Sequence, residues 1–301
     1  MVLEQIYDVE WLSKNPYFGF ILGAAYSVIG IGGALLLFPK DPALIAVAIA
    51  TILLIPSLHK LSSMAEAKEK KMEEDRMQAE LVKGVAQEKL KSYNILSILK
   101  AHKDFITIYL FIFFGIFFVF SFFALILPNL ATNVLFKQQI DIIGRSGNAI
   151  LTDPLFWEIL WNNFRVLMFC FVISLVAGNG AILLIAWNAS VWGTIFGNLA
   201  KVAAIATGKS PMVYYGLIFV SVFHHLFTEI LSYVLATISG TLMSDGLAKE
   251  KVASRQFLEI LKWNLLIFLI SLVVLVVAAA IETYVLNNFE TYSIIITQSY
   301  S

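Results

Sequence analysis

Long apolar stretches alternate with shorter polar ones along the chain, and this pattern predicts transmembrane helices. A helix needs about 20 apolar residues to cross the roughly 30 Å of hydrocarbon in a bilayer. The second of these stretches, 42–58, is short, and we expect the polar turn before it to join it to the first stretch, 17–38, as a hairpin. The stretches of this kind lie at 17–38, 42–58, 105–128, 164–187, 211–240 and 263–286.

A seventh stretch, residues 190–207, is less apolar because Asn198 and Lys201 interrupt it. It can cross the membrane against other helices. Alternatively it is a re-entrant segment, which is tolerated only where its backbone is buried in protein. We expect a crossing, and therefore an all-α, polytopic transmembrane bundle of about seven spans, or of six spans if 190–207 is re-entrant.

The basic residues indicate how the bundle is oriented, because cytoplasmic segments carry an excess of Lys and Arg. Residues 59–104 hold ten of the 21 Lys and Arg residues, and residues 244–262 hold four more. Seven spans place both segments on the same side as the N-terminus, whereas six would separate them unless 190–207 is re-entrant. The charge pattern therefore predicts a cytoplasmic N-terminus and an external C-terminus in a multi-pass protein of the cell membrane.

The polar segments divide the chain further. Residues 59–104 are rich in helix-forming Glu, Lys, Ala and Gln, which predicts a charged cytoplasmic linker helix or, alternatively, an amphipathic helix that docks on a partner or on the membrane surface. Residues 129–161 are apolar for a loop and end in Trp157 and Trp161, which favours an external helix at the membrane interface. The expected units are a transmembrane hairpin (1–58), the linker (59–104), a transmembrane core (105–286) and a tail (287–301).

The composition agrees with a membrane protein. Hydrophobic residues make up 59% of the 301 residues and charged ones only 14%, whereas soluble domains have about 25% charged residues. The mean hydropathy is +0.82. The net charge of zero indicates no nucleic-acid partner. The N-terminus lacks the basic start of a cleaved signal peptide, so we expect none. Cys170 is the one cysteine of the sequence, which excludes a disulfide within the chain. The expected surroundings are the lipid bilayer and other membrane proteins or further copies of the chain.

Ionisable residues interrupt the apolar stretch 211–240. On a helix, His225 and Glu229 lie one turn apart on the same face. A charged side chain in the middle of a membrane costs about 2.5–3.5 kcal/mol, so such groups normally face protein or water. We therefore expect the two side chains to face each other in a buried seam and to meet polar groups of the 162–188 region, where Asn179 and Asn188 are the candidates.

Two interpretations of this seam stay open, namely a structural polar contact and a proton relay or solute contact. Zinc binding is disfavoured because the adjacent His224 and His225 point about 100° apart and the zinc-protease spacing is absent. No catalytic residue, metal ligand or cofactor is expected. The candidate residues of the seam are His224, His225, Glu229, Asn162, Asn163, Arg165, Asn179 and Asn188.

Small residues recur at four-residue spacing in three of the stretches. Such spacing lets the backbones of two helices approach each other closely. The residues expected to serve helix packing in this way are Gly19, Gly23, Gly193, Gly197, Ser232, Ala236 and Gly240.

Taken in order, these motifs resemble those of the stage II sporulation protein M family. The resemblance covers roughly 105–286 and rests on paired asparagines before a span, a turn of the Asn-Gly-x-x-x-Gly kind and a Pro-His-Gly-x-x-Glu stretch. Asn162 and Asn163 match the pair, Asn188 and Gly193 match part of the turn, and His225 and Glu229 match the last stretch. The chain departs from the pattern at Ala189, His224 and Leu226.

The extra N-terminal hairpin and charged helix are similar to those of archaeal members. Bacterial members work in engulfment during sporulation, with partners that remodel the cell wall. The resemblance thus implies a non-enzymatic membrane protein that acts as a scaffold or a permease-like subunit of an envelope complex. The alternative from the residues themselves is a solute or proton-coupled transporter that uses His225 and Glu229.

Overall fold

A computed structural model describes residues 12, 14–40, 42–81, 100, 102–146, 155–249 and 254–288. The described residues form helices and no strand, which confirms the all-α fold class. The helices are α2 (Phe18–Leu37), α3 (Pro42–Leu81), α6 (Lys103–Ile126), α7 (Asn129–Leu135), α8 (Lys137–Ser146), α9 (Leu155–Ala177), α10 (Ile182–Thr207), α11 (Pro211–Lys249) and α12 (Arg255–Asn288), with a short 3-10 helix, η3 (Gly178–Ala181), between α9 and α10.

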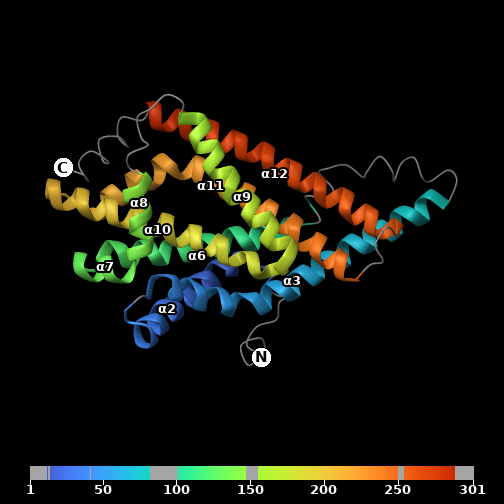
Figure 1. The fold of residues 1–301 in the computed structure, drawn as a ribbon, viewed down its shortest axis with the longest axis horizontal. Helices are drawn as coiled ribbons and strands as arrows, with labels where there is room; N and C mark the ends of the chain where they lie inside the picture. Colours follow the sequence, from blue (N-terminus) through green and yellow to red (C-terminus); the bar gives the residue numbers. More distant parts are fainter. Residues whose placement is uncertain are drawn as a thin grey trace.

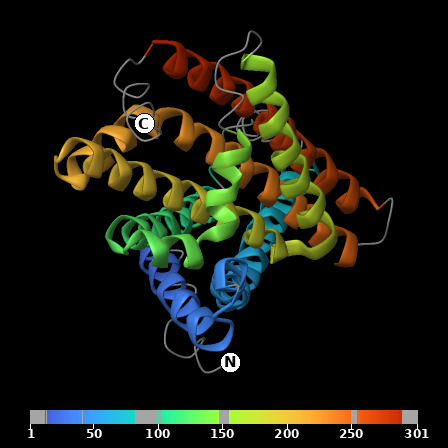
Figure 2. The ribbon, with the colours of Figure 1, turned by 60° about the vertical axis from the view of Figure 1, so that its left-hand side comes forward.

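Six helical stretches of the described residues are long and apolar enough to cross a membrane, so the protein is a multi-pass membrane protein. One of them, Leu155–Thr207, has 53 residues and contains both α9 and α10. The chain turns at η3, where Gly178 takes a positive φ of 54°, and α9 and α10 diverge from this turn like the arms of a V (Figures 1 and 2). The 26 residues of α10 reach about 39 Å at 1.5 Å per residue, which is long enough for a crossing of its own.

The first two spans form the expected hairpin, but the second does not stop at residue 58. Helices α2 and α3 pack against each other, and α3 continues through Pro56 as one helix to Leu81. The predicted linker helix is therefore an extension of the second span over 59–81, whereas 82–99 lie outside the described residues. Figure 1 shows the far end of α3 beyond the other helices, at the end of the bundle that also holds the α11–α12 junction.

Helices α6 and α11 occupy the interior. Helix α6 packs against α2 and α10, and α11 packs against α12, α9 and α10. Aromatic rings line the inner face of α6, where Phe113, Phe117 and Phe120 are fully buried. Hydrocarbon surrounds the outer faces of the bundle, so the exposed Leu, Val and Ile residues there need no covering partner.

Glycines mark the places where helices touch backbone to backbone. A Cβ atom added at Gly19 would lie 2.9 Å from the carbonyl oxygen of Ile108 in α6, and one added at Gly23 would overlap the next turn of the same helix. Gly193 and Gly197 of α10 meet α6 from another side in the same manner, and Gly240 of α11 meets α9. Ser232 and Ala236 of the same α11 face are fully buried.

The segment 129–161 is built differently from the expected interfacial helix. Residues 129–146 form the two short helices α7 and α8, and residues 147–154 lie outside the described part of the chain. Trp157 and Trp161 belong to the first turns of α9, so this span begins earlier than residue 164. Both indoles are exposed, as suits the membrane interface.

Candidate functional site

The ionisable residues of α11 lie on its protein-facing side. His225 is 3% exposed and Glu229 is 2% exposed, whereas the neighbouring His224 is exposed. The difference follows from helical geometry, because consecutive residues point about 100° apart and only one of the two histidines can share a face with Glu229. Helix α11 packs mainly against α12 and α9, and also against α10 and α6.

His225 and Glu229 are buried on one face, but they do not pair with each other. No hydrogen bond or ion pair joins their side chains, and both His225 Nδ1 and Glu229 Oε2 lack a hydrogen-bond partner. The serines of the same stripe do not supply one. Ser221 Oγ donates to the carbonyl oxygen of Leu217, and Ser232 Oγ donates to the carbonyl oxygen of Glu229 itself.

The side chains that interact with the Glu229 carboxyl come from two helices. Tyr233 lies one turn further along α11, and Glu282 projects from α12. The hydroxyl of Tyr233 faces this carboxyl, although its geometry falls short of a regular hydrogen bond, and Tyr233 is 1% exposed. Two carboxyl groups from different helices are thus close enough to repel each other inside the protein.

Helix α9 contributes an amide to the same place. Asn163 is buried, and its side-chain amide faces the carboxyl of Glu282. Its Oδ1 accepts a hydrogen bond of 3.4 Å from Asn162 Nδ2, so the two adjacent asparagines form a short chain that ends on Glu282. We refer to Asn163, His225, Glu229, Tyr233 and Glu282 as the buried polar cluster.

The side chains of this cluster provide hydrogen-bonding groups and ionisable carboxyls. Among the residues that the structure describes, no group of three or more His, Cys, Asp or Glu side chains is placed to hold a metal ion. Cys170 of α9 is buried near Tyr233 and Thr237 of α11.

Comparison with known families identifies the region that holds this cluster. The sequence model of the stage II sporulation protein M family matches residues 105–285, which is more than half of the chain. The chain belongs to the stage II sporulation protein M family. Neither the curated proteins nor the solved structures contain a match to this chain.

The stage II sporulation protein M match explains how the sequence motifs come together. The match begins at the start of α6 and ends in the last turns of α12, so it contains the whole buried polar cluster and excludes α2 and α3. The paired asparagines of α9 and the His-x-x-x-Glu pair of α11 resemble family motifs, and the fold brings both to Glu282. The motifs are 62 residues apart in the chain, counted from Asn163 to His225, and they meet only through tertiary packing.

Other candidate residues lie elsewhere in this stage II sporulation protein M fold. The prediction that Asn179 and Asn188 meet His225 and Glu229 is wrong. Asn179, in η3, accepts a hydrogen bond of 3.2 Å from Tyr109 Oη and donates one of 3.0 Å to Ser62 Oγ, so it ties the turn to α6 and α3. Asn188 donates to the carbonyl oxygen of Leu184 in its own helix.

Arg165 also lies apart from the buried polar cluster. Its guanidinium carbon lies 5.3 Å from the centroid of the Trp161 ring, and the side chain is exposed. A cation above an indole at a membrane interface is a common anchoring arrangement. Arg165 therefore supplies no counter-charge to Glu229 or Glu282.

Sequence reasoning missed Glu282 and Tyr233. Glu282 stands in "AAAIETYVL", where it is a lone carboxyl in an apolar run. The same kind of pattern had indicated Glu229 as a candidate residue. Glu282 lies near the end of the last apolar stretch, and it is not among the candidate residues expected from the sequence. Tyr233 had no comparable signal, because a tyrosine in a transmembrane helix is common at the interface and unremarkable in a core.

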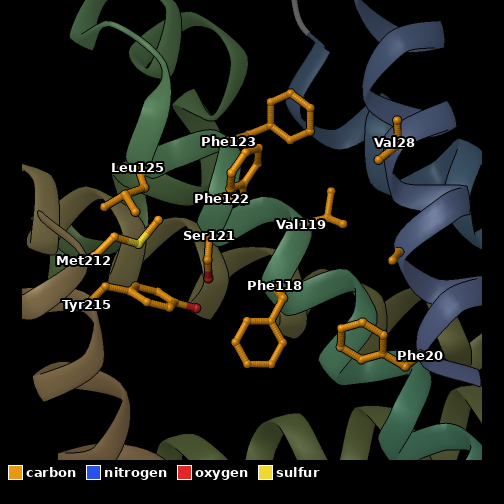
Figure 3. A pocket seen from close by; sticks show the side chains of 11 residues that line it. Phe20, Val28, Phe118, Val119, Ser121, Phe122, Phe123, Leu125, Met212 and Tyr215 are labelled. Atoms are coloured by element: carbon orange, nitrogen blue, oxygen red, sulfur yellow. The ribbon is translucent and has the colours of Figure 1, made fainter. Parts of the chain in front are cut away.

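One pocket of the described residues lies away from the cluster, between α2, α6 and the start of α11. Figure 3 shows Phe20, Val28 and Phe118 on one side and Met212 and Tyr215 on the other, with the Ser121 hydroxyl between them. Its lining is almost entirely apolar. The pocket includes neither His225 nor Glu229, so it is no aqueous path to them.

Proposed function

We propose that this protein is a non-enzymatic subunit of a membrane complex in the cell envelope and that it acts as a scaffold for its partners. The observation that carries the proposal is the extension of α3 beyond the bundle. Helix α3 has 40 residues and is about 60 Å long, whereas the hydrocarbon core is about 30 Å thick. Its apolar span ends at Met64, and the helix continues to Leu81.

The extension has the composition of a helix that meets water and other proteins. Residues 65–81 carry six acidic and four basic side chains. A helix of this length is marginal in water by itself, but continuity with the span removes the cost of starting it. It therefore projects a charged surface in a fixed direction, which is what a scaffold needs to hold a soluble or peripheral partner.

The packing of the bundle also supports a scaffold. At Gly23, Gly193 and Gly240, two helices touch through their backbones, and such contacts leave little room for one helix to slide past another. A rigid unit is better suited to holding partners in place than to opening alternately to the two sides of the membrane, as a transporter does. The second candidate, a solute or proton-coupled transporter, is favoured by the buried polar cluster alone.

We infer that the protein crosses the cell membrane seven times, with the extension of α3 in the cytoplasm. The V of α9 and α10 supplies the seventh crossing. The charged end of α3 and the α11–α12 junction then lie on one side, as the positive-inside rule requires for the two Lys- and Arg-rich segments (Figure 1). The N-terminus is on the same side and the C-terminus outside.

The scaffold proposal is tested by purifying the protein from its native membranes in mild detergent, with wild type and a charge-reversal variant compared. The variant replaces Glu69, Glu73 and Glu74 with lysine. The matched control is Glu158→Lys, which reverses an exposed charge on α9. The expected result is a stoichiometric partner that wild type and control retain and that the triple variant loses.

Two outcomes contradict the proposal. If the wild-type protein purifies without any stoichiometric partner, it is not a scaffold for a stable complex. If the triple variant keeps every partner of the wild type, the extension of α3 is not the docking surface.

A further inference from the structure

The buried polar cluster places two carboxyl groups close together without a positive partner. Glu229 is 2% exposed and Glu282 is half-buried between α12 and α9. The two groups repel each other electrostatically, and neither forms an ion pair with a Lys or Arg of the described residues. Two negative charges in such surroundings are costly, because low-dielectric surroundings neither screen nor hydrate them.

The groups that face the pair can be named for each helix packed around it. Helix α11 contributes Tyr233, α12 contributes Glu282 itself, and α9 contributes the amide of Asn163. His225 lies one turn before Glu229 on the same face of α11, and the thiol of Cys170 interacts with Tyr233. The Asn163 amide and the Tyr233 hydroxyl are the neutral donors that face the two carboxyls. Neutral donors do not balance two negative charges.

Two buried polar atoms of the cluster have no regular hydrogen-bond partner within the protein. Glu229 Oε2 and the hydroxyl of Tyr233 are both fully buried and both lack a regular hydrogen-bond partner. The hydroxyl of Tyr233 is aimed at the Glu229 carboxyl and interacts electrostatically with Glu282 as well. Native proteins rarely leave buried polar atoms without a partner, so these atoms need an explanation.

We propose that Glu229, Glu282 and Tyr233 form a binding site for one small monovalent cation, H⁺ or Na⁺, at the junction of α9, α11 and α12. Either cation removes one negative charge from the pair. A proton needs no added space and turns a carboxylate into a donor for the neighbouring oxygen. A sodium ion would use the carboxyl oxygens together with the oxygens of Tyr233 and Asn163.

Divalent cations fit this site poorly. Calcium takes six to eight oxygen ligands, and magnesium demands a near-ideal octahedron. The described residues around Glu229 do not supply such a set. The proposal does not depend on the scaffold role, because a cation can lock α12 against α9 and α11 whether or not anything is transported.

Infrared spectroscopy of the full chain in lipid nanodiscs tests the proposal directly, because a protonated carboxyl absorbs at a frequency separate from that of a carboxylate. Spectra are taken at neutral pH in choline chloride and in sodium chloride, for wild type, Glu229→Gln and Glu282→Gln. Glu158→Gln, which changes an exposed carboxyl on α9, is the control. Thermal unfolding is measured for the same samples.

If the site holds a proton, wild type and control show a buried protonated carboxyl in both salts, and each cluster variant loses it. If it holds sodium, that absorption appears in choline and disappears in sodium chloride, and sodium raises the unfolding temperature of wild type but not of the variants. The proposal is overturned if wild type shows no buried protonated carboxyl in choline and no sodium-dependent stabilisation. The wild-type measurements decide this even where a variant fails to fold.

Discussion

The contact between α10 and α6 can be tested by adding one methyl group. Gly193 lies against α6, where a new Cβ atom would overlap the carbonyl oxygen of Phe117 and approach Phe120 Cβ to 3.1 Å. The obstacle is backbone and not the end of a flexible side chain, so relief requires the two helices to move apart. Gly193→Ala should therefore destabilise the protein, although alanine favours a helix more than glycine does.

The magnitude follows from two opposing terms. Alanine in place of glycine in a helix interior contributes about 1 kcal/mol in its favour. Overpacking a close contact costs about 1–3 kcal/mol, and rigid backbone on the other side places this site at the upper end. The net loss should be about 1–2 kcal/mol, which lowers the unfolding temperature by roughly 2–8 °C for a chain of this size. Gly193→Leu should do more damage, up to loss of folding.

The single cysteine supplies the assay. Cys170 is fully buried in α9, so a maleimide dye that becomes fluorescent on reaction reports unfolding as the sample is heated. The matched control is Gly216→Ala in α11, because a Cβ atom there meets nothing within 4 Å. It should leave the protein as stable as wild type or more stable by up to about 1 kcal/mol. If Gly193→Ala and Gly216→Ala unfold at the same temperature when heated at the same rate, the backbone contact between α10 and α6 is absent.

Three further changes probe the rest of the structure. In a Cys170→Ser background, single cysteines at Lys70 and Lys251 should both react with a membrane-impermeant reagent only from the cytoplasmic side, and opposite sidedness would refute seven crossings. Asn179→Ala removes two buried side-chain hydrogen bonds and should cost about 1–3 kcal/mol in thermal stability, whereas Asn188→Ala should cost far less, so equal losses would contradict the assigned bonds. Glu229→Leu should lower the unfolding temperature because it removes the polar group that the buried Tyr233 hydroxyl faces, and Glu229→Gln should be milder because its amide keeps a polar group there; the reverse order would exclude a role for Glu229 as a polar contact.

The sequence alone was sufficient for the class of fold and for much of the helix packing. Apolar runs of about 20 residues dictate membrane helices because an unpaired backbone cannot exist in hydrocarbon, and this argument needs no tertiary information. The glycines of α2, α10 and α11 were also recognisable, because their four-residue spacing has meaning only on a helix face that another helix approaches. The same reasoning placed His225 and Glu229 inside the protein, because lipid exposure of these groups is too costly.

Only the tertiary structure decided what those groups meet. Asn179 looked available to Glu229, but the turn at η3 directs it toward α3 and α6 instead. The carboxyl that does approach Glu229 is Glu282, 53 residues further along the chain, and the amide that supports it is Asn163 of α9. Helical periodicity states which residues of one helix share a face, but the rotation and crossing angle of each helix depend on the sum of many packing contacts, which no single stretch of sequence contains.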